Sequence, residues 1–390
     1  MFKSRVDEGA ALRLLGELVK INSVNPSLVP GAHGEAEIAE YLAGHMKSLG
    51  LDAGVVEVKP GRCNAVGVLR GSGGGRSLML NGHTDTVGID YMTIDPLNPV
   101  VKEGKMYGRG AYDMKGGLVS SLAAVKAAVD SGAELRGDLV VAAVCDEEYA
   151  SIGTEGLMEE TRVDAAVVGE ATSLQILRCH KGFAWVDVES RGLAAHGSDW
   201  ENGVDAITNM GPVLTGLGEL GKGYLSRRHP TVGPASVHSG VIRGGLELST
   251  YPDRCLLRIE RRLIPGEGRR GVEEEMESLL RRVAEANPKF RGSYEITFYR
   301  DPMDVPEGEE ICRTLRDCGK ELLGFTPAFI GGGGWLDTQI IWGKGIPAVA
   351  FGPSGEGAHS AVEWVDLKSV LDAAKVQELA IRRFCGAEEA

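Results

Sequence analysis

The chain has 390 residues, of which 43% are hydrophobic and 25% charged, and its net charge is −13. This composition is typical of a globular protein large enough for two hydrophobic cores. The negative charge argues against nucleic acid or an anionic membrane surface as a partner.

The seven cysteines are odd in number, scattered, and without a C-x-x-C spacing. This pattern indicates thiols in a reducing compartment, so we expect a cytoplasmic protein with neither a disulfide framework nor a cysteine zinc site. The first residues, MFKSRVDEG, lack the apolar segment of a signal peptide, and no apolar run reaches 18 residues. We therefore expect neither a signal peptide nor a membrane span.

The first 75 residues predict two helices and two strands. Residues 7–20 and 35–50 carry apolar side chains at helical spacing. Residues 55–58 and 64–70 are typical of strands. The glycine-rich segment 71–75 lacks the Lys-Ser/Thr of a phosphate loop and precedes a strand, so it predicts a hairpin turn.

Four later apolar runs each end in a carboxylate or a histidine. They are Leu78–Leu80 before His83 and Asp85, Leu139–Cys145 before Asp146, Glu147 and Glu148, Ala165–Val168 before Glu170, and Ala348–Phe351 before His359. Ligands of open α/β sheets bind outside the carboxyl ends of the strands, and zinc takes both imidazole and carboxylate ligands. One His-x-Asp pair alone is common in surface loops, but its repetition over four strands favours a metal site.

Four glycines, at positions 108, 110, 116 and 117, surround Asp113 just before an apolar helix over 117–130. An aspartate so placed is by default the N-cap of the helix. The glycines exceed what a cap needs, however, and they allow backbone to approach closely around an ion.

Five segments of the chain resemble the five signatures of the M20 metallohydrolases. They are GHTDTV (82–87), GRGAYDMKGG (108–117), DEEYASIGTEG (146–156), VVGEAT (167–172) and GAHSAVEWV (357–365). This family includes acetylornithine deacetylases, succinyl-diaminopimelate desuccinylases, aminoacylases and glutamate carboxypeptidases. The segments occur in family order over nearly the whole chain; they identify the family but not the substrate.

The resemblance implies two zinc ions per subunit, for which Co²⁺ or Mn²⁺ can substitute. His83 and Glu170 would hold one ion, Glu148 and His359 the other, and Asp113 would bridge them. Each ion then has three protein ligands and an open position, as catalytic zinc requires. The resemblance also implies a cis peptide bond between Asp113 and Met114.

Two further roles follow from the resemblance. Asp85 would orient the His83 imidazole, and Glu147 would act as general base. Neighbouring residues of an extended chain point in opposite directions, so Glu148 can face metal while Glu147 faces the bound water. Without the surrounding motifs, Glu147 and Glu148 would be interpreted as a solvated acidic turn.

After residue 177 the pattern changes to β-α-β-β-α-β, which predicts a ferredoxin-like domain over 178–295. It is inserted into a mixed α/β metal-binding catalytic domain made of residues 1–177 and 296–390. In the M20 family such an insertion is the lid through which subunits pair, so the resemblance implies a homodimer.

The inserted domain carries three candidate substrate-site residues. His196 is either an exposed loop histidine or, as the resemblance implies, a donor to the oxyanion, reached by lid closure or from a partner subunit. Arg262 is either paired with one of the many acids or, by resemblance, binds the substrate carboxylate. Ser249 stands where the family often has asparagine, and it could donate a hydrogen bond to the intermediate.

The segment GGGGWLDTQI (331–340) departs from the family's usual Gly-Thr/Ser-Asp pattern. It retains Asp337 but introduces the bulky Trp335, in the segment expected to form the acyl-group pocket. We therefore expect Asp337 to contribute to substrate binding, and the departure leaves the acyl group open.

These observations predict an amidohydrolase that removes an N-acyl group from an amino acid, similar to an acetylornithine deacetylase. Within the family, glutamate at the position of Glu170 is typical of deacylases and carboxypeptidases, whereas aspartate is typical of aminopeptidases. A di- or carboxypeptidase acting on short peptides is the main alternative. A non-catalytic binding protein on the same fold is disfavoured, because the ligand set and Glu147 are intact.

Overall fold

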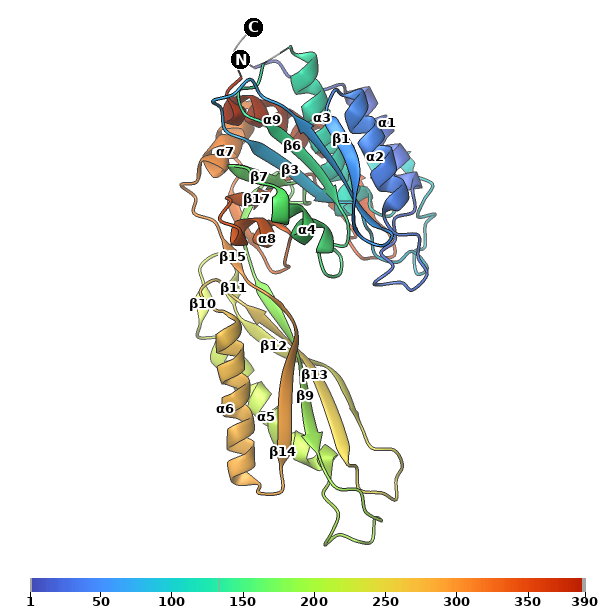
Figure 1. Cartoon of the computed structure of the whole chain (residues 1–390), viewed down its shortest axis with the longest axis vertical. Helices are drawn as coiled ribbons and strands as arrows, with labels where there is room; N and C mark the ends of the chain where they lie inside the picture. Colours follow the sequence, from blue (N-terminus) through green and yellow to red (C-terminus); the bar gives the residue numbers. More distant parts are fainter. Residues whose placement is uncertain (1, 133, 388–390) are drawn as a thin grey trace. The chain divides into compact units, whose positions relative to one another are not determined.

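The computed structural model describes residues 2–132 and 134–387. The chain forms two compact units (Figure 1). The larger contains the residues up to Arg178, Val305–Ile330 and those from Leu336 onward; the smaller contains Cys179–Asp304 and Gly331–Trp335. The predicted return at residue 296 is too early, since it would divide strand β14 (Arg291–Arg300), which pairs with β9 along most of its length.

The larger unit is built on a mixed sheet with a parallel centre. Its strands run in the order β1 (Asp52–Lys59), β2 (Arg62–Leu69), β6 (Leu139–Val144), β3 (Leu78–His83), β7 (Ala165–Val168), β17 (Ala348–Ala350), β8 (Ile176–His180) and β15 (Met303–Asp304), with β16 (Phe329–Gly332) also on β8. Strands β6, β3, β7 and β17 are mutually parallel and fully buried, so their carboxyl ends lie at one edge. This confirms the predicted fold class and the predicted edge.

Helices surround this sheet, and all but the first of them contact its strands (Figure 1). They are α1 (Glu8–Lys20), α2 (Ala36–Ser48), α3 (Gly116–Asp130), α4 (Ile152–Glu160), α7 (Glu310–Leu322), α8 (Thr338–Gly343) and α9 (Leu367–Cys385). Helix α3 packs beside α1 and α9, and α4 packs beside α8. In the described part of the chain, every helix is too short or too polar to cross a membrane.

The segment 71–75 is not the predicted hairpin turn. It joins β2 to β3, but β6 lies between these two strands and pairs with both. The pairing partner of β3 comes from much later in the chain, and local sequence carries no signal for it.

A second, small sheet positions two of the loops that carry candidate ligands. Its strands are β18 (Gly355–Glu356), β19 (Trp364–Asp366), β5 (Lys105–Tyr107) and β4 (Val100–Lys102). Pairing of β19 with β5 holds the segment after Tyr107 next to the loop between β18 and β19. Asp113 lies on the first of these segments and His359 on the second.

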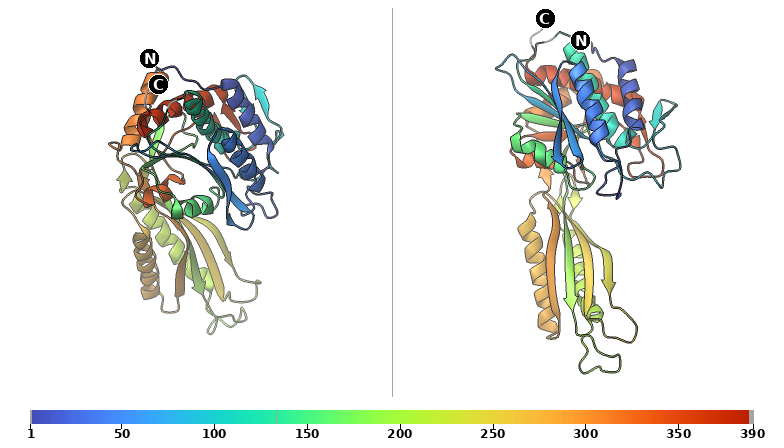
Figure 2. Two further views of the ribbon diagram at one scale, coloured as in Figure 1. Left: turned by 45° about the horizontal axis from the view of Figure 1, so that its top comes forward. Right: turned by 45° about the vertical axis from the view of Figure 1, so that its right-hand side comes forward.

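The smaller unit has the predicted β-α-β-β-α-β order (Figure 2). Its elements are β9 (Gly182–Arg191), α5 (Ala206–Tyr224), β12 (Ser236–Gly244), β13 (Arg254–Leu263), α6 (Arg269–Ala286) and β14, and the sheet order is β12-β13-β9-β14. Alternate residues of β9 and β13 are buried, with α5 and α6 completing the hydrophobic core. A short hairpin, β10 (Arg228–His229) with β11 (Gly233–Pro234), precedes β12.

Candidate metal centre

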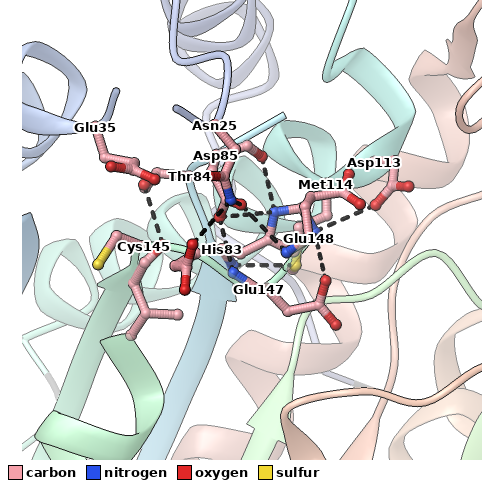
Figure 3. A network of polar contacts seen from close by, with 12 residues as sticks. Asn25, Glu35, His83, Thr84, Asp85, Asp113, Met114, Cys145, Glu147 and Glu148 are labelled. Atoms are coloured by element: carbon pink, nitrogen blue, oxygen red, sulfur yellow. Dashed lines mark hydrogen bonds and ion pairs between the residues drawn. The ribbon is translucent and has the colours of Figure 1, made fainter. Parts of the chain in front are cut away.

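The carboxyl ends of three parallel strands deliver side chains to one place. His83 is the last residue of β3, Glu147 and Glu148 follow β6, and Glu170 follows β7. Glu170 and His83 are buried, and Glu170 Oε1 lies 3.5 Å from His83 Nε2. Figure 3 shows His83 together with Glu147 and Glu148.

Asp113 lies between two imidazoles. Its Oδ1 is 3.2 Å from His83 Nε2, and its Oδ2 is 3.4 Å from His359 Nε2. One carboxylate thus faces two histidines with different oxygen atoms, as a bridging ligand of two ions would. The Asp113–Met114 peptide bond is cis, which confirms the prediction.

Close backbone packing brings the Asp113 segment to the end of β7. A Cβ atom on Gly117, at the start of α3, would lie 1.7 Å from the carbonyl oxygen of Gly169. Only glycine permits this approach. The glycines around Asp113 therefore serve close backbone approach, which a helix cap alone does not require.

Asp85 fixes the turn that carries the two glutamates. Its carboxylate accepts hydrogen bonds from the backbone amides of Glu147 at 3.1 Å and Glu148 at 3.2 Å. The Nδ1 atom of His83 lies 2.9 Å from the backbone carbonyl of Asp85 but 3.7 Å from its carboxylate (Figure 3). The imidazole is thus oriented mainly by the Asp85 carbonyl, whereas we expected the side chain to do this.

The two glutamates of this turn reach different histidines. Glu148 Oε2 lies 2.8 Å from His359 Nε2, whereas Glu147 Oε2 lies 3.9 Å from His83 Nε2. Glu147 is therefore the less tightly engaged of the two, and it lies beside the ligand cluster.

Sequence reasoning missed Glu363, which joins two of the loops. Its side chain is fully buried, with Oε1 accepting from the amides of Tyr112 and Asp113 and Oε2 accepting from the amide of Gly110 and from Arg109. Glu363 lies four residues after His359 in the same motif, so one carboxylate connects the His359 segment to the backbone of Asp113. Its position within GAHSAVEWV was the available signal.

A second missed group supports the glutamate turn from the other side. Arg62 bridges Glu35 and Asp146 at 2.6 and 2.7 Å. Asn25 donates to Asp85 at 2.8 Å and to Asp146 at 3.1 Å. These residues are buried and distant in sequence, and each resembles an ordinary polar residue when considered alone.

Several ionisable groups of the cluster have raised pKa values, because carboxylates are buried close together there. Burial raises the pKa of Glu147 well above its usual range against the lowering effect of His83, and the charges of Glu170 and Asp337 add to the increase. Burial also raises the pKa of Glu170 to about 8. Hydrogen bonds to Asp113 and Glu148 raise the pKa of His359 to about 10.

This donor set fits divalent cations. Among the described residues, two groups that share His83 have ligand atoms all within 4.8 Å of one another; they are His83 with Asp113 and Glu148, and His83 with Glu147 and Glu170. Imidazole and carboxylate are ligands that zinc accepts, and clustered buried carboxylates are stable when a cation neutralises them. The site is a candidate metal centre.

The remaining predicted residue of the larger unit, Asp337, is buried. Its Oδ2 accepts a hydrogen bond from Thr154 at 2.5 Å, and burial raises its pKa to about 6. This burial favours a supporting role behind the Glu147 turn over the direct contact with substrate that we expected.

The predicted residues of the smaller unit lie in two places. His196 is exposed and its Nδ1 is 2.7 Å from Ser198 Oγ; the amide of Gly197 donates to the carbonyl of Ser249, so His196 and Ser249 lie on adjacent segments. Arg262 pairs with Glu260 at 2.6 Å and lies over the ring of Phe183. A substrate carboxylate would have to compete with Glu260 for this guanidinium.

Comparison with known proteins places these residues in a family. The sequence model of peptidase family M20/M25/M40 matches residues 79–383. An acetylornithine deacetylase of Myxococcus xanthus is 30% identical, covering 95% of this chain and 97% of that protein. An N-formyl-4-amino-5-aminomethyl-2-methylpyrimidine deformylase of Bacillus subtilis (strain 168) is 28% identical over 89% of each chain.

Solved structures share the fold. Aminopeptidase PepT from Bacillus cereus aligns with a TM-score of 0.79 at 19% identity, covering 97% of this chain and 99% of that one. The M20 family metallo-carboxypeptidase Sso-CP2 from Sulfolobus solfataricus aligns with a TM-score of 0.79 at 18% identity, covering 96% and 99%. At these identities the likeness establishes the architecture alone.

Proposed function

The chain is a hydrolase of peptidase family M20/M25/M40, and we propose that it removes an N-acyl group from an amino acid. The observation that supports this proposal most strongly is that the two carboxylate oxygens of Asp113 face different histidines, His83 and His359. Relatives over nearly the full length are named as a deacetylase and a deformylase, and both names describe removal of an acyl group from nitrogen.

We assign the ligands of two zinc ions as follows. His83 and Glu170 would hold one ion, Glu148 and His359 the other, and Asp113 would be shared; Co²⁺ or Mn²⁺ can occupy the same oxygen and nitrogen donors. When bound, the metal pair supplies Lewis-acid polarisation of the substrate carbonyl and lowers the pKa of a water.

Glu147 is the proposed general base. It lies beside the ligand cluster, and its Oε2 is farther from an imidazole than the nearest carboxylate oxygen of Glu148, Asp113 or Glu170. The raised pKa of this carboxylate suits a group that must take a proton from water and hold it. The same oxygen can then give the proton to the leaving amine.

Two residues of the smaller unit have proposed roles toward the substrate. His196 would donate a hydrogen bond to the oxyanion, and Arg262 would bind the carboxylate of the amino acid after leaving Glu260. Exposure of His196 supports a donor that engages only with bound substrate.

We also propose that the smaller unit forms a homodimer contact. Its edge strand β12 is exposed along nearly its whole length, and an open strand edge is a ready surface for pairing with a second chain. The seven cysteines are all thiols, which supports the proposed cytoplasmic location.

A substrate panel tests the proposed function. Metal-loaded protein would be assayed for amine release from N-acetylornithine, from N-succinyl-diaminopimelate, from other N-acyl amino acids and from dipeptides. We expect kcat/KM to be highest for an N-acyl amino acid. Preference for dipeptides would favour the peptidase alternative, and binding without turnover of any compound would favour a binding protein.

A further inference from the structure

The smaller unit contains a third group of metal-ligating side chains. Cys179, His229 and Asp304 each offer one ligand atom, and these atoms lie within 4.8 Å of one another. His229 lies on β10. Cys179 and Asp304 lie on β8 and β15, which pair in the large sheet, at the two points where the main segment of the smaller unit begins and ends. None of the three belongs to the proposed hydrolytic site. Among the described residues, two other groups have ligand atoms this close together, and both contain His83.

His229 lies between the other two side chains. Its Nδ1 is 3.7 Å from Cys179 Sγ, and its Nε2 is 3.2 Å from Asp304 Oδ2. The backbone amides of Thr231 and Val232 donate to Nδ1 at 3.3 and 3.4 Å. Nδ1 therefore carries the lone pair, and Nε2 carries the hydrogen that is donated to Asp304.

This tautomer is the one that a metal-binding histidine needs. A ligating imidazole commonly donates its other N–H to a carboxylate, which fixes the ring and increases the basicity of the ligating nitrogen. Here Asp304 holds Nε2, so the lone pair of Nδ1 lies on the side of the Cys179 thiol. The two long amide contacts are the interactions that a cation at Nδ1 would replace.

We propose that Cys179 Sγ and His229 Nδ1 bind one thiophilic divalent cation of the zinc class, with Asp304 holding the imidazole. The charges suit this partly buried place, where the side chains of His229 and Asp304 are 13% and 34% exposed: a thiolate and a nearby carboxylate together balance a doubly charged cation. Cys179 is fully buried, and a thiolate there is stable only with a cationic partner. Water or a small-molecule donor would take the remaining positions.

The place of the group in the chain indicates what the cation would do. Cys179 and Asp304 are direct partners in the antiparallel pairing of β8 with β15, and they are the residues at which the chain enters and leaves the main segment of the smaller unit. The cation would connect this strand pair to the β10–β11 hairpin. It would thus stabilise the base of the smaller unit without taking part in hydrolysis.

Cobalt absorption spectroscopy of the full-length, metal-stripped protein tests the proposal. The ligands proposed for the hydrolytic centre are nitrogen and oxygen atoms, so a thiolate-to-cobalt charge-transfer band in the near ultraviolet can arise only at a cysteine site. We expect Co²⁺ titration to produce this band in the unmodified protein and in His83→Ala. The band should be lost in Cys179→Ser and retained in Cys255→Ser, which replaces another buried cysteine of the same unit.

The Asp304→Asn variant separates the roles within the group. It should keep the band but require about 10–100-fold more Co²⁺, because the carboxylate acts through the imidazole. Absence of the band at saturating Co²⁺ in the unmodified protein would overturn the proposal, as would its persistence in Cys179→Ser. If Cys179→Ser does not fold, His229→Gln takes its place, and a retained band there would equally overturn the proposal. These results do not depend on which substrate is hydrolysed.

Discussion

His359 Nε2 lies 2.8 Å from Glu148 Oε2, although the whole main segment of the smaller unit separates the two residues in the chain. The contact exists because β6 ends beside the segments that the small β18-β19-β5-β4 sheet holds in place. Asp113 lies against the same imidazole and also against His83, so the proposed two-metal centre is assembled from distant parts of the larger unit.

Replacing the general base should separate catalysis from metal binding. Glu147→Gln is expected to keep its metal content and to lower kcat by about 10²-fold or more, because the amide cannot accept the proton of water. Steady-state kinetics together with elemental analysis measures both effects. Glu160→Gln, on the exposed end of α4, is the matched control. Near-native kcat in Glu147→Gln would refute the assigned role.

Glu363 should control the metal affinity without contacting the ions. Each oxygen of the Glu363 carboxylate accepts two hydrogen bonds: Oε1 from the amides of Tyr112 and Asp113, and Oε2 from the amide of Gly110 and from Arg109. In Glu363→Gln an NH₂ group takes the place of one of these oxygens, and it cannot accept either of that oxygen's hydrogen bonds. We expect the affinity for Zn²⁺ to fall by about 10–100-fold, as measured with a competing chelator. Glu356→Gln, exposed on β18, should bind as the unmodified chain does. An unchanged affinity in Glu363→Gln would show that the Asp113 segment is positioned by other contacts.

Metal affinity should increase with pH. In the ion-free protein the pKa of His359 is raised to about 10 by its hydrogen bonds to Asp113 and Glu148, and that of Glu170 to about 8 by burial. Both groups hold protons at neutral pH, so an entering cation must displace them, and each displaced proton changes the affinity by about tenfold per pH unit. Isothermal calorimetry at pH 6, 7 and 8 in two buffers should show proton release; a pH-independent affinity would contradict the ligand assignment.

The same shifts set the pH dependence of folding stability. The folded-state pKa values of His359 and Glu170 lie above the values in the unfolded chain, so protonation of these two groups stabilises the fold. This stabilisation has its full size at low pH. It is lost as pH rises through about 8 for Glu170 and about 10 for His359. Thermal unfolding should therefore show a larger Zn²⁺-induced increase in Tm at pH 9 than at pH 6, and an equal increase at both would argue against the assignment.

The oxyanion role of His196 predicts a loss of rate with no loss of metal. His196→Ala should lower kcat by about 10²–10³-fold, the usual effect of removing one oxyanion donor. Mixing this variant with His83→Ala tests whether the donor comes from a partner subunit, since mixed dimers would then regain activity. Unchanged kcat in His196→Ala would identify it as an ordinary exposed loop histidine.

Much of the larger unit could be predicted because each of its central strands carries a recognisable pattern within its own short segment of sequence. The buried runs Leu78–Leu80 and Ala165–Val168 are too apolar for an exposed strand, and each ends in a polar ligand. Parallel strands then bring those ends to one edge by geometry alone. The cis peptide bond between Asp113 and Met114 was predicted from the family resemblance, since nothing in the local sequence pattern requires it.

The supporting residues could not be predicted because their roles depend on distant partners. Glu363 and Arg62 look like ordinary charged residues until the fold buries them against Asp113 and Asp146. Cys179, His229 and Asp304 likewise match no local spacing, which is why the sequence argued against a cysteine metal site. Asp337 was expected near the substrate, and its burial behind Thr154 follows from the packing of α4 beside α8.

The central claim is that Asp113 bridges two ions, and anomalous diffraction at the zinc edge from crystals of the Zn²⁺-loaded protein tests it most directly. Two peaks about 3.5–4 Å apart should lie on either side of the Asp113 carboxylate. One should be bonded to His83 and Glu170, and the other to Glu148 and His359. A single peak, or two peaks without Asp113 between them, would contradict the account.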